Sequence, residues 1–259
     1  MLEKIIQHKI QEIDTLKRDQ NITLSEVISM SLPKRNFEAA MLEKINLGKN
    51  AVIAELKRCS PSKGYLDKDL NIEVMAKLYE DSGAACISVL TDYKFFKGSS
   101  EDLRLVKNIT NIPILRKDFI LDKSQLIESK LMGADCILLI IACLSEDRFK
   151  ELLKYSSDLD LDVLVEVHDK NELRLALKYN CRMIGINNRN LKTFNVSVET
   201  TIELRKLIVE DNLLVISESG IKNTSIIADL NQNNINAFLV GESLVTDKKP
   251  ATLLQNMVG

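Results

Sequence analysis

Short apolar segments recur along the chain and alternate with amphipathic ones. The apolar segments have the length and composition of buried strands, and they span residues 51–57, 85–91, 112–119, 135–141, 161–168, 182–188, 213–220 and 235–241. Their apolar residues are nearly continuous, which is typical of parallel strands covered by helices on their faces. Successive segments begin roughly 20 to 35 residues apart, which is the length of one strand–helix unit.

The segments between these strands have helical periodicity. Clear examples are NIEVMAKLYEDSG, SSEDLRLVKNIT and SEDRFKELLKYSSDL. Gly83 and Gly133 follow such segments, as expected for glycine at a helix C-terminus. Eight strand–helix units predict an α/β protein with a TIM (β/α)8 barrel. A doubly wound open sheet is the alternative, but it favours a glycine fingerprint after the first strand, and KRCSPSKG does not contain G-x-G-x-x-G.

About 50 residues precede the first predicted strand. They are amphipathic, and we expect helices over Leu2 to Arg18, Thr23 to Met30 and Asn36 to Leu47. No low-complexity linker divides the chain. We therefore expect one (β/α)8-barrel domain over residues 1–259, with residues 1–50 as an N-terminal helical extension packed on it.

Composition narrows the function classes. The 35 basic and 37 acidic residues give a net charge of −2, which provides no basic footprint for nucleic acid. The longest apolar run, CILLIIACL, is far shorter than the roughly 20 residues of a membrane span, and the N-terminus has no signal-peptide core. The five cysteines form no C-x-x-C pair, which indicates a reducing cytoplasm, and two histidines cannot build a histidine-rich metal site.

Charged residues interrupt the first predicted strand. Glu55 and Lys57 are two positions apart, so their side chains share one face. Opposite charges directed into an interior cost several kcal/mol unless they are paired or used. The pair is either a salt bridge on an edge strand or part of a barrel mouth that meets a ligand.

Polar residues also gather at the ends of the other predicted strands, where the active site of a (β/α)8 barrel lies. Each has a structural alternative. Glu166 could be a paired structural carboxylate, His168 is more often a packing residue than a base, and Lys117 with Asp118 could be a surface pair. We expect Met183 and Phe194 to belong to the core. Together, the polar strand ends indicate a site, and they comprise Glu55, Lys57, Ser60, Arg116, Lys117, Asp118, Glu166, His168, Asn187, Asn188, Arg189, Glu218, Ser219, Gly220, Gly241, Glu242 and Ser243.

Small residues after the last two strands indicate a phosphate site. Gly220 and Gly241 allow backbone N–H groups to approach a ligand, and barrels frequently bind phosphate at these two loops. Ser60 and Ser62 add hydroxyl donors from the opposite side of the mouth. The chain has no metal-ligand cluster and no dinucleotide fingerprint, so we expect acid–base chemistry on a phosphorylated small molecule.

Six motifs then resemble one family. VIAELKRCSPSKG, PILRKDFI, LVEVHD, IGINNRNL, VISESGI and FLVGESL occur in the order and spacing of indole-3-glycerol-phosphate synthases, and FEAAM resembles the N-terminal extension of that family. The resemblance covers nearly the whole chain. Cys59 and Asn190 depart from the usual family residues without removing a group that the reaction needs.

The resemblance implies ring closure of 1-(2-carboxyphenylamino)-1-deoxyribulose 5-phosphate, with loss of carbon dioxide and water, in tryptophan biosynthesis and without a cofactor. It implies Lys117 as the general acid. The remaining residues implied to be catalytic are Lys57, Glu55, Glu166, Asn187 and Glu218. Those implied to bind substrate are Phe96 and Phe119 as an aromatic wall, Arg189, Leu239, and the phosphate-site residues Ser60, Ser219, Gly220, Gly241 and Glu242.

Two alternatives to this function stay open. A phosphoribosylanthranilate isomerase would use a cysteine–aspartate pair, and no cysteine ends the first strand in that role. A catalytically silent barrel that acts as a binding subunit would be expected to lack Lys57, Lys117 or Glu166. We expect a small-molecule substrate, no nucleic-acid or membrane partner and a monomer, with association with other tryptophan-pathway enzymes left open.

Overall fold

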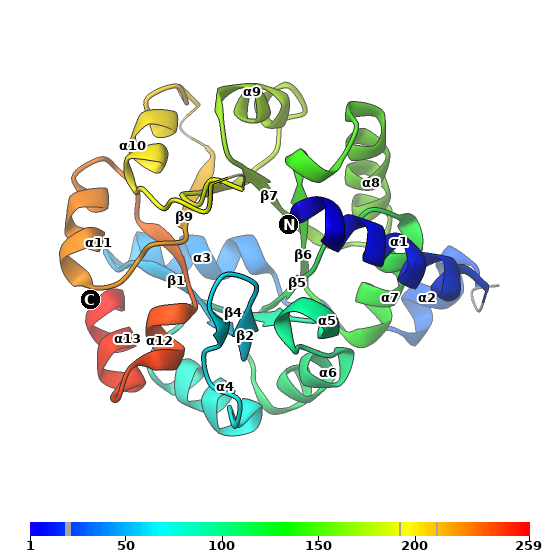
Figure 1. Ribbon diagram of the computed structural model, residues 1–259, viewed down its shortest axis with the longest axis horizontal. Helices are drawn as coiled ribbons and strands as arrows, with labels where there is room; N and C mark the ends of the chain where they lie inside the picture. The colour runs from blue at the N-terminus through cyan, green and yellow to red at the C-terminus, as the bar shows by residue number, and fades with distance from the viewer. Residues whose placement is uncertain (19–21, 192, 211) are drawn as a thin grey trace.

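The strands of the computed structural model form a closed parallel barrel, and the structure describes residues 1–18, 22–191, 193–210 and 212–259. The strand order around the barrel is β1-β10-β9-β8-β7-β6-β5-β4 (Figure 1). The predicted TIM barrel is confirmed and the open-sheet alternative is wrong. The barrel strands are β1 (Ala51–Leu56), β4 (Cys86–Leu90), β5 (Ile114–Lys117), β6 (Cys136–Ile140), β7 (Asp162–Val167), β8 (Met183–Asn187), β9 (Leu214–Glu218) and β10 (Ala237–Val240).

Each observed strand lies inside its predicted segment and is shorter than that segment. Parallel pairing closes the barrel at β1, where Ile53 is opposite Cys86 of β4 and Leu239 of β10. The strand ends and the loops that follow them carry the candidate site.

Helices cover the outside of the barrel (Figure 1). Most begin at a side chain that caps the free N–H groups of the first turn, such as Asp122 before α7 and Ser145 before α8. Gly133 ends α7 with φ 92°, as predicted from its position. These helices are α4 (Ile72–Asp81), α6 (Ser100–Ile109), α7 (Lys123–Met132), α8 (Glu146–Asp158), α9 (Lys170–Lys178), α10 (Glu199–Arg205), α11 (Thr224–Asn231), α12 (Glu242–Thr246) and α13 (Pro250–Val258).

The barrel interior changes from apolar to charged along its axis. Its N-terminal half is filled by buried apolar side chains, including Ile53, Leu115 and Leu164. Two residues further along the same strands, the inward positions hold Glu55, Lys117 and Glu166. The apolar layers therefore form a rigid floor beneath the charged groups.

The N-terminal helices pack at both ends of the barrel. α3 (Phe37–Asn46) closes the N-terminal end, where Phe37 and Met41 are fully buried against the barrel floor. α1 (Leu2–Arg18) lies across the opposite end, in front of the barrel in Figure 1. α2 (Leu24–Met30) packs against α7, and the bounds of all three helices agree with the predicted ones within one residue at each end.

Four short elements follow the strand ends and carry no clear periodicity in the sequence. β2 (Cys59–Ser60) and β3 (Gly64–Tyr65) form a small antiparallel hairpin after β1. α5 (Tyr93–Phe96) follows β4, and the 3-10 helix η1 (Ile141–Cys143) follows β6. Among the helices that the structure describes, none is both long enough and apolar enough to cross a membrane.

Candidate active site

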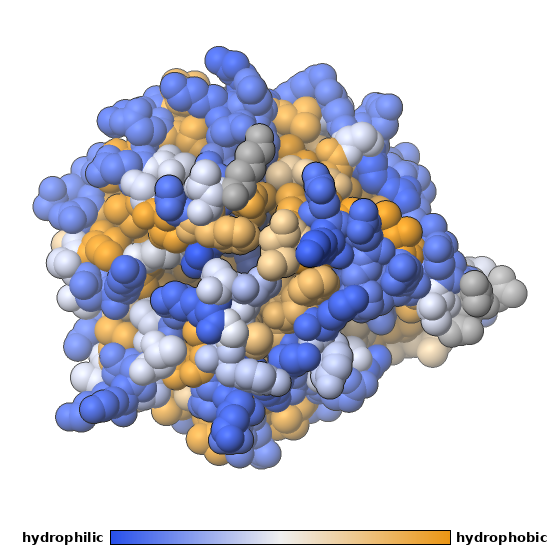
Figure 2. Space-filling view, viewed as in Figure 1, coloured by the Kyte–Doolittle hydropathy of each residue, from blue (hydrophilic) through white to orange (hydrophobic). Residues whose placement is uncertain are grey.

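A cavity of about 820 Å³ opens at the C-terminal ends of the strands. Figure 2 shows its mouth as a hollow near the middle of this face, with hydrophobic and charged residues side by side on the rim. The structure brings together around this cavity all the residues that the sequence assigned to catalysis or substrate binding: Glu55, Lys57, Ser60, Phe96, Lys117, Phe119, Glu166, Asn187, Arg189, Glu218, Ser219, Gly220, Leu239, Gly241 and Glu242. Their individual roles stay predictions.

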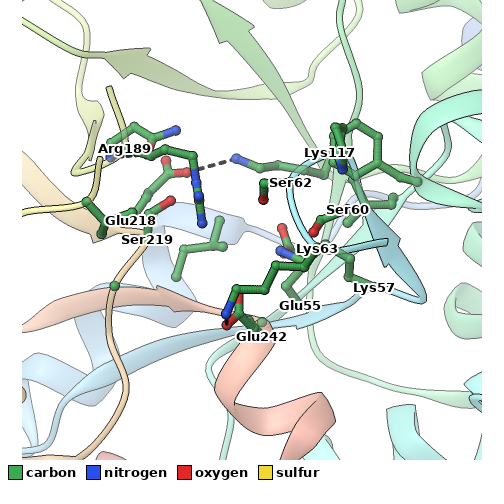
Figure 3. Close-up of a pocket in the computed structure, with 18 of the residues that line it drawn as sticks. Glu55, Lys57, Ser60, Ser62, Lys63, Lys117, Arg189, Glu218, Ser219 and Glu242 are labelled. Atoms are coloured by element: carbon green, nitrogen blue, oxygen red, sulfur yellow. Dashed lines mark hydrogen bonds and ion pairs between the residues drawn. The ribbon is translucent and has the colours of Figure 1, made fainter. Parts of the chain in front are cut away.

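Lys117, the last residue of β5, reaches into the cavity between two carboxylates. Its Nζ lies 3.0 Å from Oε2 of Glu166 and 2.8 Å from Oε2 of Glu218 (Figure 3). Burial disfavours the charged amine, but the surrounding carboxylates outweigh burial and raise the pKa of Lys117 above its ordinary value. The side chain is therefore an ammonium that faces the cavity.

The two carboxylates that hold Lys117 differ in proton affinity. Burial alone would raise the pKa of Glu166, but Lys117 and His168 outweigh burial and lower it well below its usual range. For Glu218, burial and the charge of Glu166 dominate over Lys117 and raise the pKa to about 7. One carboxylate is thus firmly ionised, whereas the other exchanges a proton near neutral pH. Such a difference is typical of acid–base sites.

Two glycines make room for the inward carboxylates. A Cβ on Gly185 of β8 would lie 2.0 Å from Oε1 of Glu218, and one on Gly241 would lie 2.4 Å from Oε1 of Glu55. Sequence reasoning assigned no role to Gly185. A glycine inside an apolar strand was the available signal, because such a glycine often marks a close approach of another group.

The charges on β1 face the cavity. Lys57 forms an ion pair with Glu55, whose side chain is almost fully buried. The pair therefore lies at the barrel mouth and the edge-strand alternative is wrong, whereas contact with a ligand stays a prediction. Nearby, the buried Oγ of Ser60 has no hydrogen-bond partner among the described residues. A buried hydroxyl without a partner is the expected state of a donor that serves a ligand.

Backbone turns line the side of the cavity after β9. Ser219 has φ 66° and Gly220 has φ 82°, so two successive residues adopt the left-handed conformation. Asn188, which does not line the cavity, supports this turn by donating from Nδ2 to the Ser219 carbonyl at 3.0 Å. The turn directs successive backbone groups toward the cavity, a geometry suited to an anion. Figure 3 shows Arg189 and Ser219 on this side, opposite Ser60 and Lys63.

A separate part of the cavity, around Phe96 and Phe119, is apolar. Phe96 and Phe119 lie with ring centroids 6.2 Å apart and an interplanar angle of 35°. Sequence reasoning missed further lining residues here, namely Leu138 and Ile140 of β6 and Met1, Leu2 and Ile5 at the start of α1. It also missed Lys63 and Lys222, which line the polar side.

Several polar strand-end residues do not reach the cavity. Arg116 points outward to α7, where its Nη2 lies 2.6 Å from Oε2 of Glu128. His168 lies behind Glu166 and outside the cavity lining. Asp118 lines the cavity and binds Lys9, so Lys117 and Asp118 are not a surface pair.

Phe194 was expected in the core, but it is 37% exposed and lines the cavity, because it lies in a loop with φ 61°.

Metal ligation is not supported by the described residues. Within residues 1–18, 22–191, 193–210 and 212–259, no group of three His, Cys, Asp or Glu side chains is arranged to hold a metal ion. The groups that converge on the cavity are ammonium, guanidinium, carboxylate, hydroxyl and backbone N–H. This set performs proton transfer and anion binding.

These features define a (β/α)8-barrel enzyme with an acid–base site at the C-terminal ends of its strands. Solved structures agree with the fold. 3-Hexulose-6-phosphate synthase from Salmonella typhimurium aligns with a TM-score of 0.62 and 14% identity, covering 80% of this chain and 96% of that one. KGPDC from Streptococcus mutans aligns with a TM-score of 0.58 and 13% identity, covering 81% and 95% of the two chains.

The sequence comparisons are more specific. The model of the family described as indole-3-glycerol phosphate synthase matches residues 2–257. An indole-3-glycerol phosphate synthase from Polaromonas sp. is 45% identical over 260 residues, which cover 100% of this chain and 98% of the relative. One from Acinetobacter baumannii is 42% identical over 252 residues, covering 96% and 92%. The chain belongs to the indole-3-glycerol phosphate synthase family, the carboxy-lyases of tryptophan biosynthesis.

Proposed function

We propose that the protein converts 1-(2-carboxyphenylamino)-1-deoxyribulose 5-phosphate to indole-3-glycerol phosphate, carbon dioxide and water, with the residues of the barrel mouth in defined roles. The observation that carries this proposal is the buried ammonium of Lys117 between Glu166 and Glu218, facing a cavity with one aromatic side and one anion-binding side. Family membership supports the substrate.

In the proposed mechanism, Lys117 is the general acid of ring closure. Attack of the aromatic ring on the ribulose carbonyl builds negative charge on the carbonyl oxygen. A positioned ammonium stabilises that charge and then donates the proton. The raised pKa of Lys117 supports this role, because the amine carries its proton before the reaction begins.

Glu166 and Glu218 share the proton transfers that follow. Glu166 is the base that removes a proton from the substrate during dehydration, since its lowered pKa keeps it ionised. Glu218, with a pKa raised to about 7, passes a proton to Lys117 at 2.8 Å and restores the ammonium, which then protonates the hydroxyl that leaves as water. Asn187 donates from Nδ2 to Oε1 of Glu166 at 3.0 Å and fixes the carboxylate.

The two ends of the substrate bind on opposite sides of the cavity. Phe96 and Phe119 contact the anthranilate ring, and Lys57, held by Glu55, pairs with its carboxylate until decarboxylation. The phosphate accepts hydrogen bonds from Ser60 and from backbone N–H groups at Ser219, Gly220, Gly241 and Glu242. The partnerless hydroxyl of Ser60 and the left-handed turn at Ser219 support this assignment. Arg189 and Leu239 complete the wall beside the phosphate.

The test is the appearance of indole fluorescence when the carboxyphenylamino-deoxyribulose phosphate is added to purified protein. We expect a continuous rise that depends on enzyme concentration. Lys117→Met is the matched control, because it keeps the length of the side chain and removes the proton donor. Folded wild-type protein that gave no indole signal would contradict the proposed function.

We also propose that the protein acts as a monomer in the cytoplasm and forms a single cooperative domain. All five cysteines are free thiols, which supports a reducing compartment. Light scattering during size-exclusion chromatography tests the monomer, and coincident unfolding transitions by fluorescence and circular dichroism test the single domain.

A further inference from the structure

His168 lies behind the cavity, where it joins Glu166 to a second carboxylate. Its Nε2 lies 3.1 Å from Oε1 of Glu166, and its Nδ1 lies 3.0 Å from Oε2 of Glu172 on α9. The backbone N–H of His168 donates to the same Glu172 oxygen at 2.8 Å, so the loop and the ring are fixed together. The ring is about 10% exposed and does not line the cavity.

Both ring nitrogens of His168 therefore face carboxylate oxygens. A neutral imidazole has one N–H donor and one lone pair, so one nitrogen would direct a lone pair at an anion. An imidazolium donates from Nδ1 to Glu172 and places positive charge, not a lone pair, at Nε2 beside Glu166. The contact between Nε2 and Glu166 is an ion pair without hydrogen-bond geometry. The geometry alone thus favours the protonated ring.

The remaining groups around His168 agree with this protonation state. Burial and the charges of Glu166 and Glu172 all raise the pKa of the Cys143 thiol in η1, to about 12, so this thiol stays neutral. Lys117 lies on the far side of Glu166, bound to Oε2. Burial opposes a charge on His168, yet the two carboxylates outweigh burial and raise its pKa to about 10.

We propose that His168 is a positioning residue: as an imidazolium fixed by Glu172, it keeps the Glu166 carboxylate ionised and oriented toward the cavity. Oε1 of Glu166 accepts a hydrogen bond from Asn187 and lies in ion-pair contact with His168, and Oε2 binds Lys117. Groups from three separate parts of the barrel mouth thus define one orientation of the carboxylate. The proposal rests on the proposed role of Glu166 as the base. It adds Glu172, outside the cavity, as the group that sets the charge of His168.

The first test measures the protonation of His168 without reference to activity. The chain has two histidines, so His8→Gln leaves one imidazole Cε1–H signal in the NMR spectrum. We expect this signal to stay at the imidazolium position up to about pH 8, although an unperturbed histidine titrates near pH 6.5. Glu172→Gln keeps the shape of the side chain and removes its charge, and it should lower the midpoint by at least about one pH unit. A wild-type midpoint at or below about 6.5 would overturn the proposal.

The second test links that protonation to catalysis through kcat as a function of pH. In Glu172→Gln, the ratio of the variant kcat to the wild-type kcat should be near one below the new midpoint and fall about tenfold above it, because His168 then loses its proton. Glu146, an exposed residue at the start of α8, pairs with Lys178. Glu146→Gln is therefore the matched control, and its kcat ratio to wild type should not change with pH. His168→Gln should lower kcat about tenfold at every pH, with little change in KM.

The outcomes separate the two proposals. If the loss of kcat in Glu172→Gln does not follow the NMR midpoint, the His168–Glu172 pair is only structural. That result overturns the role of His168, while the proposed function stands. A folded wild-type protein that forms no indole overturns the proposed function and, with it, this role. A loss that follows the midpoint supports both.

Discussion

Nζ of Lys9 on α1 lies 2.9 Å from Oδ1 of Asp118, the residue that follows Lys117 in the chain. The same Nζ lies 3.2 Å from Oδ2 of Asp92, which caps the helix that carries Phe96. Lys9 is 3% exposed. Burial opposes its charge, but the carboxylates outweigh burial and raise the pKa of Lys9. One buried ammonium thus joins the N-terminal helix to the segment that follows Lys117 and to the segment that carries Phe96.

We therefore expect Lys9→Met to weaken substrate binding. The variant removes the cation that Asp118 and Asp92 share, although Asp118 keeps its pair with Arg116, so the start of α1 loses its fixed position over the cavity. KM should rise about tenfold, with a smaller change in kcat, and the free energy of unfolding should fall by about 3 kcal/mol. Steady-state kinetics and urea unfolding measure the two effects. Lys4→Met, on the exposed face of α1, is the control, and a folded Lys9→Met protein with unchanged KM would refute this role of α1.

The carboxylates on either side of Lys117 should give opposite pH dependences of stability. The pKa of Glu218 is raised to about 7 in the folded protein, so its contribution to stability is fully present below the unfolded value near 4.5 and is lost as pH rises toward 7. Glu218→Gln removes the ionisable group and with it this pH-dependent loss of stability. Its stability relative to wild type should therefore increase between about pH 4.5 and pH 7, by up to about 3 kcal/mol.

Glu166 provides the matched comparison. Its pKa is lowered, so its contribution is present above the unfolded value and is lost as pH falls through the folded value. Glu166→Gln should consequently be less stable than wild type at pH 7 and approach it in acid. Urea unfolding of both variants from about pH 3 to pH 8 measures the two trends, since the contribution of Glu166 changes below about pH 4.5 and that of Glu218 changes above it. Parallel pH dependences in the two variants would contradict the assignment of different proton affinities.

Inorganic phosphate should compete with the substrate at the turn that contains Gly220. Gly220 has φ 82°, and a Cβ there would lie 2.6 Å from Cγ1 of Val196. Gly220→Ala should therefore distort the turn and raise the inhibition constant for phosphate at least about tenfold, with a smaller change in kcat. Gly48→Ala is the control, because Gly48 has φ 74° but no atom within 4 Å of its added Cβ. Phosphate inhibition that is noncompetitive, or equal in the two variants, would count against this site.

Strand periodicity and strand-end chemistry were enough to predict the barrel and most of the polar half of the cavity, although they missed Lys63 and Lys222. The inward direction of Glu55 and Lys57 follows from the two-residue period of a strand, and the closed barrel confirms it. Arg116 shows the limit of this reasoning. It precedes Lys117 and faces outward to Glu128, so proximity to a strand end does not by itself place a side chain in the site.

The apolar half of the cavity could not be predicted in the same way. Leu138 and Ile140 have the same residue types and spacing as core positions, and only the closed barrel shows that they border open space. Ile5 of α1 is far from the strands in sequence, and its contribution depends on how Lys9 fixes the helix. Phe194 was predicted in the core for a related reason, since a bulky apolar residue gives no sign of the left-handed backbone that exposes it.

The most direct test of the account compares Lys117→Met with Lys57→Met, measuring kcat together with a separately determined dissociation constant for the substrate. Lys117→Met should lower kcat by about 10² to 10⁴-fold, the usual range for loss of a general acid, with little change in the dissociation constant. Lys57→Met should weaken binding as well as lower the rate, because it removes a contact to the bound substrate. Circular dichroism confirms that each variant is folded. Near-normal kcat in Lys117→Met, together with an inactive Lys57→Met, would contradict the account and reverse the roles of the two lysines.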